Sequence, residues 1–120
     1  MYTISKEFNF CASHRLACLP EGHPCTKWHG HNYSIILEFQ SETLDEAGMV
    51  VDYRQLKPVG EMIDNLFDHQ ELNDKMDLNP TAENISAFLY KKITETFPEL
   101  PKLKAVTVKE TEKTAARYEE

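Results

Sequence analysis

The residues best suited to chemistry lie close together in the sequence, because Cys25, His29 and His31 fall within seven residues of one another. The segment that follows, residues 33–39, has apolar side chains at its odd positions, the period-two pattern of a strand with one buried face. The same parity places both histidines on that face. Side chains two residues apart on a strand project the same way, ~6.5 to 7 Å apart at the backbone, so both imidazoles can reach one metal ion.

An earlier strand offers a third imidazole. Alternate residues of the segment 8–14 are apolar, and the series ends in His14. If the two strands pair as a long hairpin, His14 can face His29 and His31. Three histidines without a fourth protein ligand are typical of an open catalytic zinc site, whereas a structural zinc is normally closed by a fourth Cys or His. The simpler alternative is that the two later histidines belong to a turn with polar residues at a strand end.

Three further groups can act near such a site, and each also has a simpler explanation. Cys25 is either an idle loop thiol or, beside a cation, a thiolate that serves as base or nucleophile. Asp68 and His69 are either a polar helix end or a carboxylate–imidazole pair for proton transfer near neutral pH. Glu110 continues the buried parity of an apolar strand, so it is either a solvated charge or an acceptor for N–H groups of a ligand.

Composition limits the classes of function. A chain of 120 residues predicts a single domain, residues 1–120, and a net charge of −7 argues against a nucleic-acid partner. No apolar run approaches ~18 residues and no signal-peptide pattern is seen, so we expect no membrane segment and a cytoplasmic location. Cys11, Cys18 and Cys25 are an odd number of cysteines, which we interpret as free thiols.

The remaining pattern predicts the elements that position these residues: strand, long loop, strand, two helices and two strands, an α+β fold. The long loop covers residues 16–28 and carries Cys25. Asp52 and Thr81 are expected to cap the two helices, and Pro58 is expected to kink the first helix or delay its start. The last strands are expected at residues 103–110 and 114–118. An antiparallel sheet of four strands has two open edges, and closure of a barrel by several subunits would cover them.

Taken together in order, these motifs resemble the 6-pyruvoyltetrahydropterin synthase family. The resemblance rests on residues 10–16, 22–33, 51–52, 66–69, 79–84 and 108–111. The spacing Cys25-x-x-x-His29-Gly-His31 is similar to that of the bacterial branch, 6-carboxy-5,6,7,8-tetrahydropterin synthase of queuosine biosynthesis. The animal pyruvoyl-forming branch typically has a longer gap between its cysteine and its histidine pair.

The resemblance implies the tunnelling fold (T-fold), in which ββααββ subunits form a trimeric barrel and two trimers stack as a homohexamer. It also implies the substrate 7,8-dihydroneopterin triphosphate, which this branch converts to 6-carboxytetrahydropterin with release of acetaldehyde and triphosphate. Zn²⁺ would be held by three histidines, namely His14, His29 and His31. Cys25 would be the base, and Asp68 and His69, from the same or a neighbouring subunit, would relay protons.

For the substrate itself, the resemblance implies that Glu110 anchors the pterin ring and that Thr81 lines the pterin pocket. Many relatives have a polar residue after that threonine, whereas this chain has Ala82. The triphosphate needs cations in an acidic protein, and Arg15 and Lys27 are the candidates because they lie next to the motifs.

Three alternatives remain open at this stage. The chain can be a pyruvoyltetrahydropterin synthase or a folate-branch relative that acts on the same substrate. It can be a zinc-dependent hydrolase with water at the open metal position, although Cys25 and Glu110 would then have no evident task. It can also be a pterin-binding oligomer without activity, and then Cys25→Ala would leave its role intact.

Overall fold

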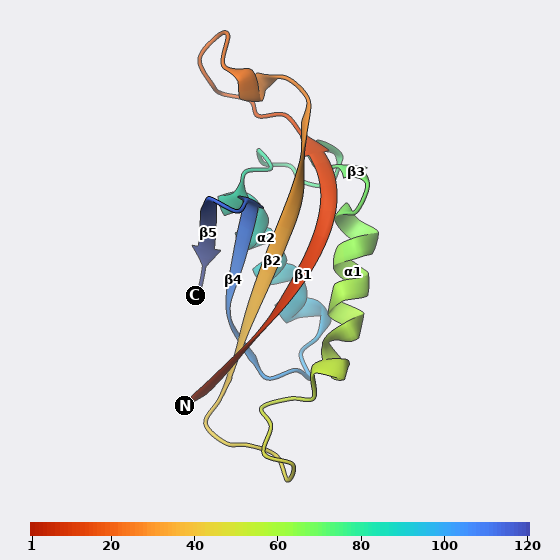
Figure 1. The fold of residues 1–120 in the computed structure, drawn as a ribbon, viewed down its shortest axis with the longest axis vertical. Helices are drawn as coiled ribbons and strands as arrows, with labels where there is room; N and C mark the ends of the chain where they lie inside the picture. The colour runs from red at the N-terminus through yellow and green to blue at the C-terminus, as the bar shows by residue number, and fades with distance from the viewer.

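A computed structural model describes residues 1–120, and its main feature is a long antiparallel hairpin (Figure 1). The hairpin strands are β1 (Tyr2–His14) and β2 (His29–Ser41). Their register runs from Tyr2 opposite Ser41 to His14 opposite His29. Strands β4 (Lys102–Thr111) and β5 (Thr114–Tyr118) complete the antiparallel part of the sheet, in the order β1-β2-β4-β5. The α+β fold and the predicted strand order along the chain are therefore confirmed.

The prediction of a four-stranded sheet was incomplete, because a fifth strand is present. This strand, β3 (Gln70–Glu71), pairs in parallel with β1 at Ala12 and Ser13 and forms one edge of the sheet. A strand of two residues has no periodicity in the sequence. It forms because the chain leaving the first helix runs alongside β1, where the backbone N–H of His69 donates to the carbonyl of Cys11.

The second helix begins where the sequence indicated, whereas the first begins later than its expected cap, Asp52. Asp52 caps a 3₁₀ turn, η2 (Tyr53–Leu56), and α1 (Lys57–Phe67) follows with Pro58 in its first turn, so the proline delays the regular helix. Thr81 caps α2 (Ala82–Thr96) by accepting a hydrogen bond from the backbone N–H of Asn84. Two further 3₁₀ turns, η1 (Pro24–Thr26) and η3 (Leu72–Asp74), lie in the connecting segments.

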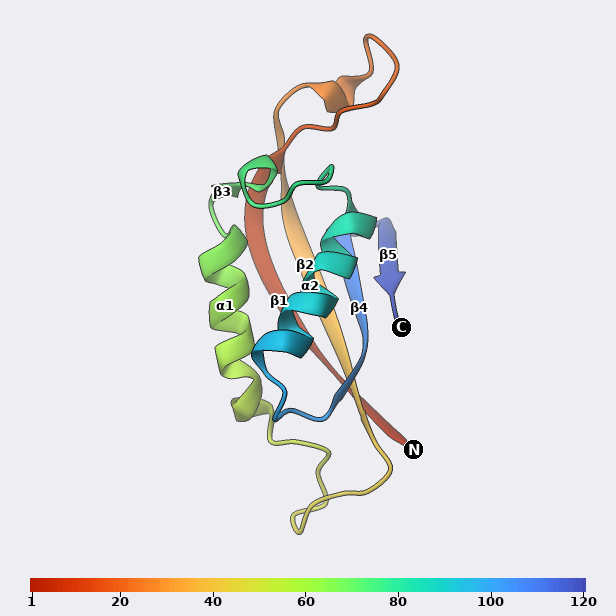
Figure 2. The ribbon, with the colours of Figure 1, turned by 180° about the vertical axis from the view of Figure 1, so that it is seen from behind.

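Both helices cover the same face of the sheet, and the core lies between them and the strands (Figure 2). The odd positions of β2 from Tyr33 to Phe39 are buried there, as the period-two pattern predicted. No helix of the chain is long and apolar enough to cross a lipid bilayer.

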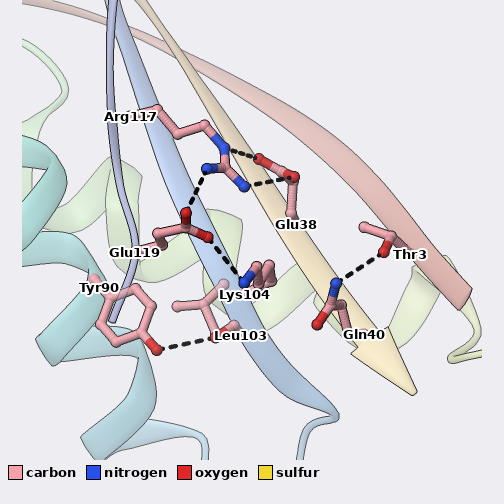
Figure 3. A network of polar contacts seen from close by, with 8 residues as sticks. All are labelled: Thr3, Glu38, Gln40, Tyr90, Leu103, Lys104, Arg117 and Glu119. Atoms are coloured by element: carbon pink, nitrogen blue, oxygen red, sulfur yellow. Dashed lines mark hydrogen bonds and ion pairs between the residues drawn. The ribbon is translucent and has the colours of Figure 1, made fainter. Parts of the chain in front are cut away.

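Polar side chains link the strands on the face of the sheet away from the helices (Figure 3). Arg117 of β5 donates two hydrogen bonds to Glu38 of β2 and also pairs with Glu119, which in turn contacts Lys104 of β4. Exposed ion pairs of this kind add little stability singly.

The molecule is elongated, with extents of 56 × 24 × 24 Å. The segment between β1 and β2, which contains η1, projects beyond the end of the sheet (Figure 1). His14 and His29 lie at the start of this projection, because they form the last pair of the hairpin register. The fold therefore brings the candidate metal ligands and the loop with Cys25 to one end of the molecule.

Candidate metal centre and active site

Three imidazoles converge at the end of the hairpin. His14, His29 and His31 offer nitrogen atoms that all lie within 4.8 Å of one another. Their ring centroids are 4.5 Å apart for His14 and His29, 5.1 Å for His14 and His31, and 5.0 Å for His29 and His31. The antiparallel register places His14 directly opposite His29, and the period of two brings His31 to the same face.

In two of the three rings, a backbone carbonyl fixes which nitrogen carries the proton. His14 Nδ1 lies 2.8 Å from the carbonyl oxygen of Pro80, and His29 Nδ1 lies 2.8 Å from that of Lys27. A carbonyl oxygen can only accept, so Nδ1 is the protonated nitrogen and the lone pair of each neutral ring is on Nε2. These two Nε2 atoms are 2.9 Å apart, so two lone pairs point into the same space. A cation between them would satisfy both.

The third ring shows the same need for a partner. His31 Nε2 is buried and has no hydrogen-bond partner, and the nearest carboxylate oxygen, Oε2 of Glu110, is 3.8 Å away. Buried polar atoms in native proteins are nearly always paired, so an orphaned imidazole nitrogen beside two converging lone pairs indicates a ligand-binding position. The residues present therefore fit a bound metal ion.

Burial favours the ligating form of one of the three donors, His14. The His14 side chain is fully buried, and this burial lowers its pKa, which favours the neutral imidazole that a metal requires. Burial also raises the pKa of Tyr33, whose hydroxyl is 3.2 Å from His14 Nδ1, so this hydroxyl remains protonated. A set of three converging imidazoles with an open position matches catalytic zinc sites.

A cavity of 680 Å³ lies beside the three histidines and has both His31 and Glu110 in its wall. It opens because β2 and β4 stay paired only as far as Ser34 and Lys109, beyond which the strands separate. Asp68 lines the same cavity. One chain therefore brings a candidate metal ligand, the predicted pterin anchor and a predicted catalytic carboxylate to one cavity.

Asp68 and His69 lie where α1 ends and the chain meets β1. Asp68 Oδ1 accepts a hydrogen bond from the backbone N–H of Cys11, which leaves Oδ2 3.7 Å from His69 Nε2. His69 has a φ of 58°, a left-handed conformation that few non-glycine residues adopt, and its side chain is 81% exposed. His69 lines a second, more open cavity that shares His31 with the first.

Cys25 is not brought into the wall of either cavity, nor does it belong to the converging donors. It lies half-buried in η1, and its backbone N–H donates to His23 Nδ1. Arg15 and Lys27 are exposed next to the histidines, and the Arg15 guanidinium lies 5.3 Å from the ring centre of Trp28.

The sequence missed two residues at the site, and one residue that it predicted there has another role. Pro80, whose carbonyl orients His14, lies 66 residues away from it, and no local pattern signals such a contact. Thr81 was expected to line a pocket, but its hydroxyl caps α2 and neither cavity beside the histidines includes it. Lys109 lies in the wall of the 680 Å³ cavity and is a further cation there. Because Lys109 alternates with buried Val108, the sequence could have indicated a cation on the other face of the strand, next to Glu110.

Comparisons with known proteins identify the family of the chain. The family model described as 6-pyruvoyl tetrahydropterin synthase matches residues 3–120. The 6-carboxy-5,6,7,8-tetrahydropterin synthase of Rickettsia bellii is 30% identical in an alignment that covers 83% of this chain and 83% of that protein. The dihydroneopterin monophosphate aldolase of Pyrococcus furiosus is 35% identical over 80 residues, covering 67% of this chain and 68% of that protein.

The fold comparison leads to the same group. The structure of Caenorhabditis elegans 6-pyruvoyl tetrahydropterin synthase superimposes with a TM-score of 0.85 at 26% identity, covering 99% of this chain and 95% of that one. The chain therefore belongs to the 6-pyruvoyl tetrahydropterin synthase family, a family of enzymes with the T-fold.

Proposed function

We propose that this protein is a zinc-dependent 6-carboxy-5,6,7,8-tetrahydropterin synthase of queuosine biosynthesis. It converts 7,8-dihydroneopterin triphosphate to 6-carboxytetrahydropterin with release of acetaldehyde and triphosphate. The observation that carries the proposal is the group of three converging histidines, with the orphaned His31 Nε2, beside a cavity that also contains Glu110. The similarity to the Rickettsia bellii enzyme supports the choice of product.

The metal would be held by His14, His29 and His31, and it would supply a doubly charged Lewis acid for the hydroxyl groups of the substrate side chain. Glu110 is an acceptor-only side chain, so it would bind the amino group and the ring N–H of the pterin. Because Glu110 and His31 line the same cavity, a ring bound by Glu110 would have its side chain toward the histidines.

Proton transfer would use the remaining predicted groups. Cys25 would remove a proton from the substrate side chain, and Asp68 with His69 would relay or return protons. The Asp68 carboxylate is held by the backbone of Cys11, which keeps its second oxygen toward the His69 ring. The triphosphate would be bound by Arg15 and Lys27, with Lys109 as a further cation at the cavity.

The active form would be a hexamer made of two trimers. Strand β3 covers β1 only at Ala12 and Ser13, so most of the outer edge of β1 is unpaired, and β5 forms the opposite edge. Pairing of these two edges between neighbouring subunits would close a barrel and remove both. Such contacts would also bring groups of neighbouring subunits, including the loop with Cys25, to the site.

The test is incubation of the zinc-loaded protein with 7,8-dihydroneopterin triphosphate, with mass spectrometry of the pterin products and an assay of acetaldehyde. Cys25→Ala is the test variant, and Cys18→Ala, which removes an exposed thiol of the same loop, is its matched control. The proposal predicts 6-carboxytetrahydropterin and acetaldehyde with the wild type and Cys18→Ala, and a strong loss with Cys25→Ala. Turnover that ignores Cys25, or no turnover, would contradict it.

A second candidate activity is cleavage that leaves a hydroxymethyl group on the pterin. It is favoured by the 35% identity to the Pyrococcus furiosus dihydroneopterin monophosphate aldolase. The same product analysis separates the possibilities, because a 6-hydroxymethyl pterin would indicate this aldolase-type reaction and a 6-pyruvoyl pterin would indicate the pyruvoyl-forming branch.

A further inference from the structure

Beyond the end of β1, two asparagine side chains hold the backbone of residues 15–17. The Asn73 amide accepts a hydrogen bond from the backbone N–H of Arg15 and donates one to its carbonyl, both at 2.9 Å. The Asn79 amide makes the same pair of bonds with Ala17, at 2.9 and 2.8 Å. A side-chain amide carries the same donor and acceptor as a peptide group, so the two asparagines replace a neighbouring strand after β3 ends.

The opposite edge of the same short segment holds the loop that carries Cys25. Leu16 lies between Arg15 and Ala17, the two residues that the asparagine clamps hold. Its backbone N–H donates to the carbonyl of Cys25 at 2.8 Å. Alternate residues of an extended chain direct their backbone groups to opposite sides, so fixing Arg15 and Ala17 on one side also fixes Leu16 on the other. The position of the Cys25 backbone therefore depends on the two asparagines.

The Asn79 clamp is itself anchored beside the three histidines. The backbone carbonyl of Asn79 accepts hydrogen bonds from the Asn84 side chain and from the backbone N–H of Thr81, at the start of α2. The next residue, Pro80, accepts the hydrogen bond from His14 Nδ1. One short segment, residues 79–80, therefore contacts both a candidate metal ligand and the chain segment to which the Cys25 loop is bonded.

We infer that Asn73 and Asn79 are positioning residues that set the place of Cys25 relative to the histidines. The inference rests on the proposed function, in which Cys25 is the base. Neither asparagine needs to contact the substrate, because each acts through the backbone of residues 15–17. Loss of a clamp would leave the metal ligands in place and move the thiol.

The main test compares Asn79→Ala with wild type, with Asn65→Ala as a matched control because Asn65 is exposed on α1. Amide hydrogen exchange of residues 15–27 should become faster by about tenfold in Asn79→Ala, while the amides of β2 and β4 keep their wild-type rates. Turnover, kcat, should fall by about tenfold to a hundredfold at an unchanged zinc content of the protein. Asn65→Ala should match the wild type in every respect.

Two further measurements separate positioning from a merely structural role. Alkylation of Cys25 by iodoacetamide should become faster in Asn79→Ala, because the half-buried thiol is released, while alkylation of Cys11 in the sheet should not change. Asn79→Asp keeps the acceptor for the Ala17 N–H and loses the donor, so its kcat should lie between those of wild type and Asn79→Ala. Asn73→Ala tests the second clamp in the same way.

The inference is overturned if exchange in residues 15–27 stays at the wild-type rate, if it rises together with exchange in β2 and β4, or if kcat is unchanged although the loop is released. If the wild type does not turn over the pterin substrate, the proposed function fails, and hydrogen exchange with Cys25 alkylation still decides whether the clamps hold the thiol.

Discussion

Replacement of Glu110 by glutamine tests the proposed pterin anchor. The carboxylate lines the 680 Å³ cavity, and its Oε2 atom is 3.8 Å from His31 Nε2. Glutamine has nearly the same shape, but one acceptor oxygen becomes an NH₂ donor that faces the N–H groups of the pterin. At least one charge-assisted hydrogen bond is lost, which is worth about 1.5–3 kcal/mol. We therefore expect kcat/KM to fall about 10- to 150-fold.

The assay is steady-state kinetics with zinc-saturated protein, together with measurement of zinc content. Glu112→Gln is the matched control, because Glu112 lines the same cavity and carries the same charge at the turn after β4. We expect this control to keep kcat/KM near the wild-type value, and both variants to keep the zinc content of the wild type. If Glu110→Gln loses zinc and regains full activity in excess zinc, the carboxylate supports the metal and the anchoring argument is wrong.

Three further substitutions test the structural reasoning through urea unfolding. His69 has a φ of 58°, a conformation that glycine adopts more easily, so His69→Gly should raise the free energy of unfolding by up to about 1 kcal/mol. The same substitution should reduce turnover. A lower free energy of unfolding would refute the inferred strain. Thr81→Ala removes the hydroxyl that accepts a hydrogen bond from the Asn84 N–H, and it should lower the free energy of unfolding by about 1 kcal/mol. An unchanged free energy of unfolding would mean that the cap contributes nothing. Phe67→Ala leaves a cavity at a fully buried position and should lower the free energy of unfolding by about 3–5 kcal/mol. A decrease below about 1 kcal/mol would contradict the packing described.

Much of the fold could be predicted from the sequence because its elements are long and strongly patterned. The parity of residues 33–39 and 8–14 predicted two strands, and their pairing brought His14 opposite His29. The helix starts could be predicted because Asp52, Pro58 and Thr81 act locally on the backbone next to them. Strand β3 could not, because two residues carry no period and the strand depends on the path of the chain after α1.

The candidate site was predictable in its residue types and less so in its supporting contacts. Two neighbouring histidines on one strand face follow from spacing alone. The carbonyl of Pro80 and the clamps of Asn73 and Asn79 join residues 58 to 66 positions apart, and side-chain bonds to distant backbone leave no periodic signal. The relation of Cys25 to the histidines could not be predicted either, because it depends on the long loop and, in the proposed hexamer, on neighbouring subunits.

The most direct test of the central claim is a zinc titration of metal-free protein during turnover of 7,8-dihydroneopterin triphosphate. The account predicts that formation of 6-carboxytetrahydropterin rises with added zinc and stops rising at one zinc ion per chain, and that His31→Ala shows no such rise. Full activity in the metal-free protein, or an unchanged titration curve in His31→Ala, would contradict the claim that the three histidines form a catalytic zinc site.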